Sequence, residues 1–204
     1  MKTVSTSPPR AMTDSVALRR IVSPYPAGAV EMRVLADGRP LLIRPLAARD
    51  AEPLQEFIRG LSPHSRYQRF QSTLHELPPA LLAKLTNLDY RHSMAFAAIV
   101  FEHGHRRIIG EARYAPALDR QDAVEFGLAV SDAWQRQGLG RLLLDRLIQY
   151  AERSGIARIQ GDVLHDNAGM LHLTRQLGFT ARTHRDGAWL TRVERKLGSF
   201  AISA

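Results

Sequence analysis

The sequence predicts one α+β domain in which helices flank a central sheet that is mixed but largely antiparallel. Three apolar runs separated by turn residues cover residues 94–130, as is typical of an antiparallel meander. Apolar residues then recur at helical spacing over residues 139–151, which indicates an amphipathic helix. A strand, a helix and two more strands follow, as in a β-α-β crossover. Together these observations predict a sheet of about six or seven strands.

The folded domain is expected to span residues 31–204, after a flexible leader. Residues 1–30 are rich in proline, serine, threonine and alanine without a sustained period. A hairpin is predicted next, because two apolar segments flank Asp37-Gly38, a dipeptide suited to a tight turn. Apolar residues at helical spacing then predict three short helices, which could form a lid over one end of the sheet, at residues 48–61, 62–70 and 79–87.

The second half of the chain alternates between strand and helix patterns. Strands are predicted at residues 94–101, 107–114 and 123–130, then at 157–164, 179–183 and 188–196. The helix that begins near residue 139 is expected to end at Gly155, and a helix over residues 167–177 is expected to end at Gly178, since glycine commonly follows a helix C-terminus. No internal repeat is present.

The amino-acid composition excludes several kinds of structural and catalytic site. Apolar residues make up 45% of the 204 residues, enough for a substantial core, and the chain has no cysteine. Disulfide frameworks, thiolate nucleophiles and cysteine zinc sites are therefore excluded. His103 and His105 lie in a predicted turn without nearby carboxylates, so they are interpreted as loop residues, and no metal is expected.

Charge and hydropathy point to a cytoplasmic protein. No apolar run resembles a signal peptide or a membrane span. The net charge of +8 comes almost entirely from arginine, which binds phosphate and carboxylate groups in bidentate fashion. The excess suits a phosphate-rich ligand or an acidic partner, although it also fits an ordinary surface rich in arginine. Nucleic-acid binding is disfavoured, because the arginines are scattered along the chain.

A glycine turn follows the strand that ends at Val130. The turn reads Gln135-Arg136-Gln137-Gly138-Leu139-Gly140-Arg141 and leads into the amphipathic helix. The first turn of a helix has free backbone N–H groups and partial positive charge, and glycines allow a pyrophosphate to approach closely. The spacing fits neither a Walker loop nor a dinucleotide fingerprint. By itself the turn indicates an anion site or simply a strand-to-helix connection.

Three segments in order make the resemblance specific: residues 124–130, the Gln135-x-x-Gly138-x-Gly140 turn, and Asn167 followed by Leu177-Gly178-Phe179. This arrangement resembles the core of the GNAT acetyltransferases. Further segments are similar to the acetyltransferase domain of bacterial protein lysine acetyltransferases of the Pat type, among them residues 43–46, 61–70 and 167–171. The resemblance covers residues 31–197 and implies the GNAT fold.

The resemblance also implies acetyl-CoA as co-substrate. In that family the glycine turn holds the pyrophosphate, the end of the preceding strand pairs with the pantetheine arm, and the asparagine lies beside the cofactor. Carried over by position, the resemblance implies that pantetheine contacts Leu128, Ala129 and Val130. The pyrophosphate would be bound by Gln135, Arg136, Gln137, Gly138, Leu139, Gly140 and Arg141. Asn167 would lie beside the pantetheine or the acetyl end.

Glu125 is the candidate general base. Strand alternation places it opposite an apolar face formed by Val124, Phe126, Leu128 and Val130, so it must either join an ion pair or line a cleft. Its position matches the base glutamate of histone-type GNAT enzymes and of the Pat-type domain. An amine acceptor has to lose a proton before it attacks a thioester, which gives a base a role.

The acceptor remains open between two classes. Many small-molecule GNAT enzymes carry a tyrosine acid seven residues after the asparagine, where this chain has Thr174. That departure favours transfer to protein lysine over transfer to a small amine. A third hypothesis is a non-catalytic, acyl-CoA-binding regulatory module, which the presence of Glu125 disfavours. On the helix over residues 62–70, Arg66 and Arg69 are expected either to face water or to attract an acidic patch. The oligomeric state is not predicted.

Overall fold

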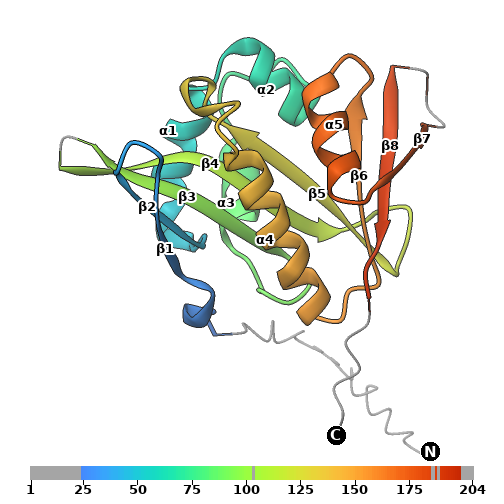
Figure 1. Ribbon diagram of the computed structural model, residues 1–204, viewed down its shortest axis with the longest axis horizontal. Coiled ribbons are helices and arrows are strands. Elements are labelled where there is room, and N and C mark those ends of the chain that lie inside the picture. The colour runs from blue at the N-terminus through green and yellow to red at the C-terminus, as the bar shows by residue number, and fades with distance from the viewer. Residues whose placement is uncertain (1–23, 103, 185–186, 188, 199–204) are drawn as a thin grey trace, which may run out of the picture.

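The computed structural model describes residues 24–102, 104–184, 187 and 189–198, and it confirms the predicted α+β class. Eight strands form one sheet in the order β1-β2-β3-β4-β5-β6-β8-β7 (Figure 1). Neighbouring strands are antiparallel except β5 and β6, which are parallel. The sheet exceeds the predicted number of strands because both the N-terminal and the C-terminal hairpins join it.

The elements follow the predicted order. The strands are β1 (Glu31–Val34), β2 (Pro40–Pro45), β3 (Met94–Glu102), β4 (His105–Pro116), β5 (Ala123–Val130), β6 (Arg158–Leu164), β7 (Thr180–Thr183) and β8 (Leu190–Lys196). The helices are α1 (Ala51–Arg59), α2 (Pro63–Phe70), α3 (Pro79–Thr86), α4 (Leu139–Arg153) and α5 (Ala168–Gln176). Short 3-10 turns are η1 (Ala27–Ala29), η2 (Ala48–Asp50) and η3 (Asp132–Trp134).

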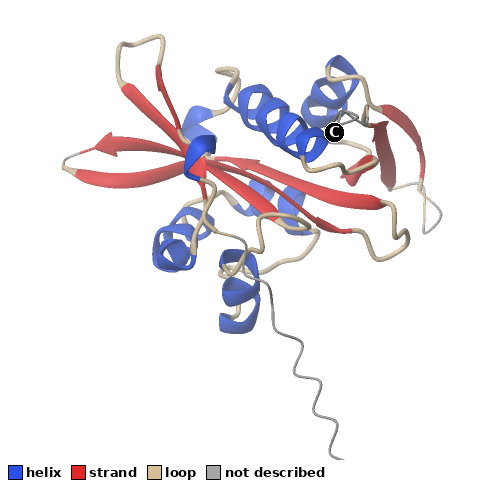
Figure 2. Ribbon diagram, turned by 90° about the horizontal axis from the view of Figure 1, so that it is seen from below, coloured by secondary structure: helices blue, strands red, loops and turns tan. Residues whose placement is uncertain are grey.

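Helices cover both faces of the sheet (Figure 2). The larger of two buried clusters in the described structure lies between the sheet and α4. It includes Leu143, Leu144 and Leu147 of α4 and the alternate residues Phe126 and Leu128 of β5. A second core lies on the opposite face, where α1 and α3 cover the first half of the sheet. There the smaller side chains of β3, such as Ala95 and Ala97, admit the helices closely.

The described part of the predicted leader, residues 24–30, contacts the domain. The Tyr25 hydroxyl donates to the Pro45 carbonyl at 3.1 Å, and Ala29 is buried. The boundary placed at residue 30 stays a prediction, and residues 1–23 and His103 lie outside the described residues.

Candidate active site

A cleft opens where β5 and β6 diverge. The two strands pair only from Ala123–Arg158 to Glu125–Gln160 in the described structure, and beyond that point they separate toward α2 and α5 (Figure 1). The resulting cleft has a volume of about 580 Å³. Along this edge the backbone of β5 has no neighbouring strand, so its N–H and C=O groups can pair with an extended ligand.

The glycine turn forms one end of this cleft. Gly138 is the N-cap residue of α4 with φ of 81°, a conformation that glycine adopts without strain. The first turn of α4 therefore starts at the cleft with its backbone N–H groups free for an anion. Arg136 and Arg141 line the same end and add positive charge. The residues present fit a pyrophosphate.

Most of the residues predicted from sequence meet in this cleft. Its lining includes Glu125, Leu128, Ala129, Val130, Gln135, Arg136, Gly138, Gly140, Arg141 and Asn167. Two predicted residues do not line it. Leu139 is buried in the core beneath α4, and the Gln137 side chain donates to the Ala133 carbonyl at 3.0 Å. Any contact of these two with a ligand would therefore come from their backbone.

An aspartate that the sequence analysis did not single out secures the turn. Asp132 accepts hydrogen bonds from the hydroxyls of Ser62 and Ser65, both at 2.7 Å, and from the Ser62 amide at 2.9 Å. The Gln135 side chain donates to the Ser65 hydroxyl and to the Val130 carbonyl, both at 3.1 Å. These bonds join the start of α2 to the turn. Ser62 is the N-cap residue of α2, and a serine at the start of an expected helix is the only one of these features that the sequence indicates.

Asn167 and Thr174 lie on α5. Asn167 caps this helix, because its Oδ1 accepts from the Met170 amide at 3.0 Å. Thr174 is 1% exposed, and its hydroxyl donates to the Leu171 carbonyl at 3.1 Å within the same helix. The Thr174 hydroxyl thus points into the helix backbone, and Thr174 is not among the residues that line the cleft. It is unsuited to act as an acid there.

Glu125 lines the cleft with an exposed side chain. The surrounding protein partly desolvates the carboxylate, and this, together with the Asp162 and Asp119 carboxylates, raises the pKa of Glu125, whereas Arg192 and Arg69 lower it. No described residue forms a hydrogen bond or ion pair with Glu125. Of the two alternatives left by strand alternation, the cleft is therefore correct.

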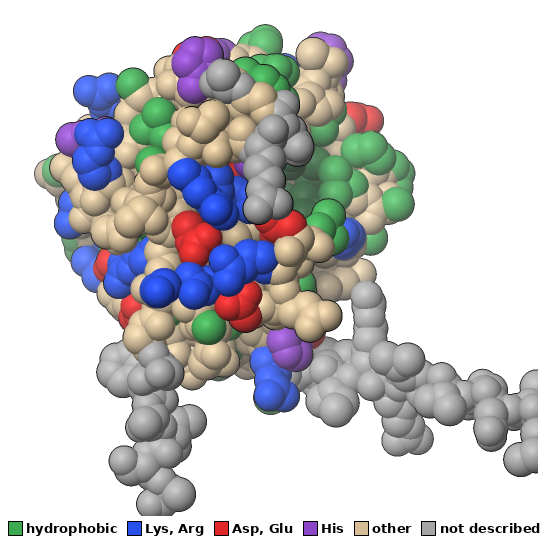
Figure 3. All heavy atoms as spheres, turned by 90° about the vertical axis from the view of Figure 1, so that its right-hand side faces the viewer, with side chains coloured by type: hydrophobic (Ala, Val, Ile, Leu, Met, Phe, Trp, Pro, Cys, Tyr) green, Lys and Arg blue, Asp and Glu red, His purple; other side chains and the backbone are tan. Residues whose placement is uncertain are grey.

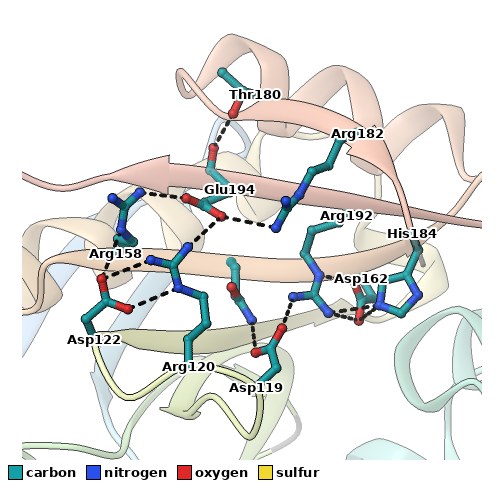
Figure 4. Close-up of polar contacts among 11 residues, drawn as sticks. Asp119, Arg120, Asp122, Arg158, Asp162, Thr180, Arg182, His184, Arg192 and Glu194 are labelled. Atoms are coloured by element: carbon teal, nitrogen blue, oxygen red, sulfur yellow. Dashed lines mark hydrogen bonds and ion pairs between the residues drawn. The ribbon is translucent and has the colours of Figure 1, made fainter. Parts of the chain in front are cut away.

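A polar network of residues from β6, β8 and the loop between β4 and β5 acts on Glu125 electrostatically. Figure 4 shows the contacts within this network. Arg192 of β8 binds Asp162 through two nitrogens and donates to Asp119 at 2.7 Å. Gln160, the register partner of Glu125, also donates to Asp119 at 2.7 Å. Strand alternation places Gln160 and Asp162 on one face of β6, but their contacts with Asp119 and Arg192 depend on the tertiary structure. We call Asp119, Gln160, Asp162 and Arg192 the Arg192 network.

Viewed from the C-terminal strands, basic and acidic side chains alternate across this surface (Figure 3). Further pairs extend the network toward the sheet edge: Glu194 contacts Arg120, Arg158 and Arg182 at 3.5, 2.7 and 3.6 Å. The surface is therefore a mosaic of paired charges, which does not favour a strongly charged partner.

No group of three His, Cys, Asp or Glu side chains among the described residues could hold a metal ion. None of the helices in the described part is long and apolar enough to cross a membrane.

Comparisons with known proteins agree with this geometry. The model of the "Acetyltransferase (GNAT) family" matches residues 61–179. "Acetyltransferase PA5475" of Pseudomonas aeruginosa is 38% identical over 152 residues, which cover 74% of this chain and 81% of that protein.

Two solved structures share the fold. The crystal structure of the GNAT domain of S. lividans PAT has a TM-score of 0.74 and 29% identity, and the match covers 85% of this chain and 99% of that one. The structure of yncA, a putative acetyltransferase of Salmonella typhimurium with its cofactor acetyl-CoA, has a TM-score of 0.59 and 21% identity over 80% of this chain and 96% of that one.

Proposed function

This chain belongs to the GNAT family of acetyltransferases, and from that premise we propose that it transfers the acetyl group of acetyl-CoA to the Nε-amine of a protein lysine, with Glu125 as general base. The enzyme is an acetyl-CoA-dependent N-acetyltransferase by family. Membership disfavours the hypothesis of a non-catalytic regulatory module. The acceptor class and the roles of individual residues are the proposal, and the cytoplasmic location stays a prediction.

The observation that carries the proposal is the position of Glu125 relative to the glycine turn. Both lie in one cleft, at opposite ends of the free edge of β5. Glu125 and Val130 are separated by five residues of strand, or about 17 Å. An extended pantetheine arm that pairs with this edge would lead from a pyrophosphate at Gly138 toward Glu125. The thioester would then arrive beside the carboxylate.

The proposed reaction requires one proton acceptor and no covalent enzyme intermediate. The neutral amine nitrogen attacks the acetyl carbonyl carbon, and a backbone N–H on the free edge of β5 stabilises the developing negative charge on the oxygen. Before the attack, Glu125 takes one proton from the ammonium form of the amine. When the carbon–sulfur bond breaks, the second proton on the nitrogen passes to water. CoA leaves as thiolate and takes a proton from water, because Thr174 cannot supply one.

Access to Glu125 supports a protein acceptor. On the face of the sheet that carries Glu125, α1 and α3 pack over the first half of the sheet, and α2 lies against β5 through Arg69. The Glu125 side chain remains exposed. A metabolite enzyme would be expected to enclose its acceptor in a cavity. The open approach leaves space for a lysine presented on a protein surface, and the likeness to the GNAT domain of S. lividans PAT points the same way.

The acceptor can be identified by competition between acceptor classes. Purified protein is incubated with labelled acetyl-CoA and three acceptors in parallel: N-terminally blocked lysine peptides, peptides with a free N-terminus but no lysine, and a panel of small amines. We expect label on the blocked lysine peptides at neutral pH. Label confined to small amines would overturn the lysine proposal while leaving the acetyltransferase assignment intact, and label on free N-termini alone would replace lysine with the α-amine.

A further inference from the structure

Arg69 lies inside the protein, against β5. Its guanidinium rests on Gly127, so closely that a Cβ at residue 127 would lie 2.5 Å from the guanidinium carbon. It also lies over the Phe70 ring, 4.8 Å from the centroid. The sequence expectation that Arg69 faces water or an acidic partner is therefore wrong. Gly127 leaves the space on β5 that the buried guanidinium occupies.

The charge of Arg69 is only partly balanced. Arg69 Nη2 lies 3.7 Å from Glu111 Oε2, and Arg113 donates to the other oxygen of the same carboxylate. The three side chains are 12%, 2% and 8% exposed. Two arginines thus share one glutamate, and Arg69 Nε and Arg113 Nη2 are buried without a hydrogen-bond partner among the described residues. A buried net positive charge needs a further anion nearby.

Glu125 is positioned to be that anion. In the register of β4 and β5, Arg113 pairs with Gly127 and Glu111 with Ala129, so these residues share the face that carries Glu125. Glu125 is the next residue on that face after Gly127, about 7 Å along the strand. With Glu125 ionised, two guanidinium groups are balanced by two carboxylates.

We propose that Arg69 is a positioning residue that keeps Glu125 ionised, and so ready to accept the proton of the acceptor amine. The inference rests on the proposed role of Glu125 as base. Burial lowers the pKa of the Arg69 guanidinium, but a guanidinium ordinarily titrates so far above neutral pH that it keeps its proton in the working range. Arg69 lines the same cleft as Glu125.

The other charged groups around Glu125 come from different elements. Asp162 of β6 and Asp119 of the loop between β4 and β5 raise its pKa, while Arg192 of β8 lowers it. Arg192 is already bound by both of those carboxylates, and His184 lies 3.4 Å from Asp162. Arg69 differs because its one carboxylate, Glu111, is shared with Arg113. Loss of Arg69 should therefore raise the pKa of Glu125, because one of the positive charges that lower it is removed.

The test measures the Glu125 carboxyl directly. Carbon-13 NMR of the glutamate carboxyl groups is followed against pH in the wild type and in Arg69→Gln, with the Glu125 signal assigned by its absence in Glu125→Gln. We expect the Glu125 titration to move upward in Arg69→Gln and to move less in Arg69→Lys, which keeps a charge. Arg153→Gln removes one exposed arginine at the far end of α4 and should leave the titration unchanged.

Gly127→Ala provides an independent variant if Arg69→Gln does not fold. It keeps Arg69 but forces the guanidinium away from β5, so the Glu125 titration should again move upward. The acidic limb of kcat/KM should move with it. An unchanged titration in whichever of these variants folds would overturn the inference. Because the NMR signal does not depend on turnover, this result is separate from failure of the proposed acetyl transfer, which the acceptor competition would reveal.

Discussion

Glu125 combines two properties that a general base needs. It is exposed to the cleft, and no described residue holds its carboxylate in a fixed hydrogen bond. A raised pKa makes the Glu125 carboxylate a stronger base for accepting the amine proton, but the carboxylate must still be ionised at neutral pH. The sequence could indicate this residue, because a single carboxylate interrupts an apolar strand. The charged groups that shift its pKa come from four other parts of the fold: α2, the loop between β4 and β5, β6 and β8.

Glu125→Gln tests the residue itself. The amide keeps the shape of the side chain but cannot accept the amine proton, so kcat/KM for the acceptor should fall by about 10²–10⁴-fold near neutral pH. The Kd of acetyl-CoA, measured by calorimetry, should stay within about twofold. Glu76→Gln, which changes an exposed glutamate paired with Arg59, is the matched control. Turnover equal to that of the control would remove Glu125 from the role of base.

At the level of elements, the connection from β5 to α4 is shaped by backbone conformation as much as by charge. Gly138 has a positive φ at no cost, but Arg136 has a φ of 62°, which is unfavourable for a residue with a Cβ. Strain of this kind concentrates at ligand-binding sites. The turn therefore retains an arginine where glycine would be more stable, as expected if the arginine contacts a pyrophosphate.

Arg136→Gly and Arg136→Gln separate these two effects. Glycine relieves the backbone and should raise the free energy of unfolding by about 0.5–1 kcal/mol, whereas glutamine keeps the strain and should not. Both variants lose the charge, so both should weaken acetyl-CoA binding by about 3–10-fold. Thermal unfolding and calorimetric titration of the three proteins provide the comparison. Unchanged binding in both variants would exclude Arg136 from the pyrophosphate site.

At the level of the whole molecule, buried carboxylates connect stability to pH. Asp50, whose side chain is 5% exposed, accepts hydrogen bonds from Arg44 at 2.7 and 2.6 Å and from the Ala47 amide at 2.8 Å. Burial alone would raise the pKa of Asp50, but these bonds outweigh it and hold the pKa below its usual value. The pair joins β2 to the start of α1.

The expected pH dependence follows from that direction. A carboxylate with a lowered folded pKa adds stability above its unfolded pKa of about 3.9, and this stability is lost as pH falls through the lower folded value. Urea unfolding should therefore show a declining midpoint below about pH 4. Asp50→Asn should cost about 3–5 kcal/mol at pH 7, because Arg44 is left buried and unpaired, and should flatten the decline.

Asp145→Asn is the control for this comparison, since the Asp145 carboxylate accepts from the exposed Gln149 on the surface of α4. Equal losses in the two variants at pH 7 would show that the Arg44–Asp50 pair is not a distinct source of stability.

The sequence by itself determined the order of elements, the glycine turn and the candidate base. These features are local: helical periodicity, strand alternation and a glycine at a helix start each act within a few residues, so they can be interpreted without knowing the neighbours. The predicted number of strands was slightly low. A hairpin near either end of a chain can pair with the central sheet or stay separate from it, and tertiary packing determines which of the two occurs.

The tertiary structure decided how the cleft is bordered. Three features of the cleft depend on residues that are far apart in the chain. They are the separation of β5 from β6, the packing of Arg69 against Gly127, and the Arg192 network. An arginine on a helix usually faces water. The sequence around Arg69 does not show that Gly127, on another element, provides space for its guanidinium. Side-chain charges interact over several ångströms in space, whatever their separation along the chain, so the environment of Glu125 exists only once the sheet has formed.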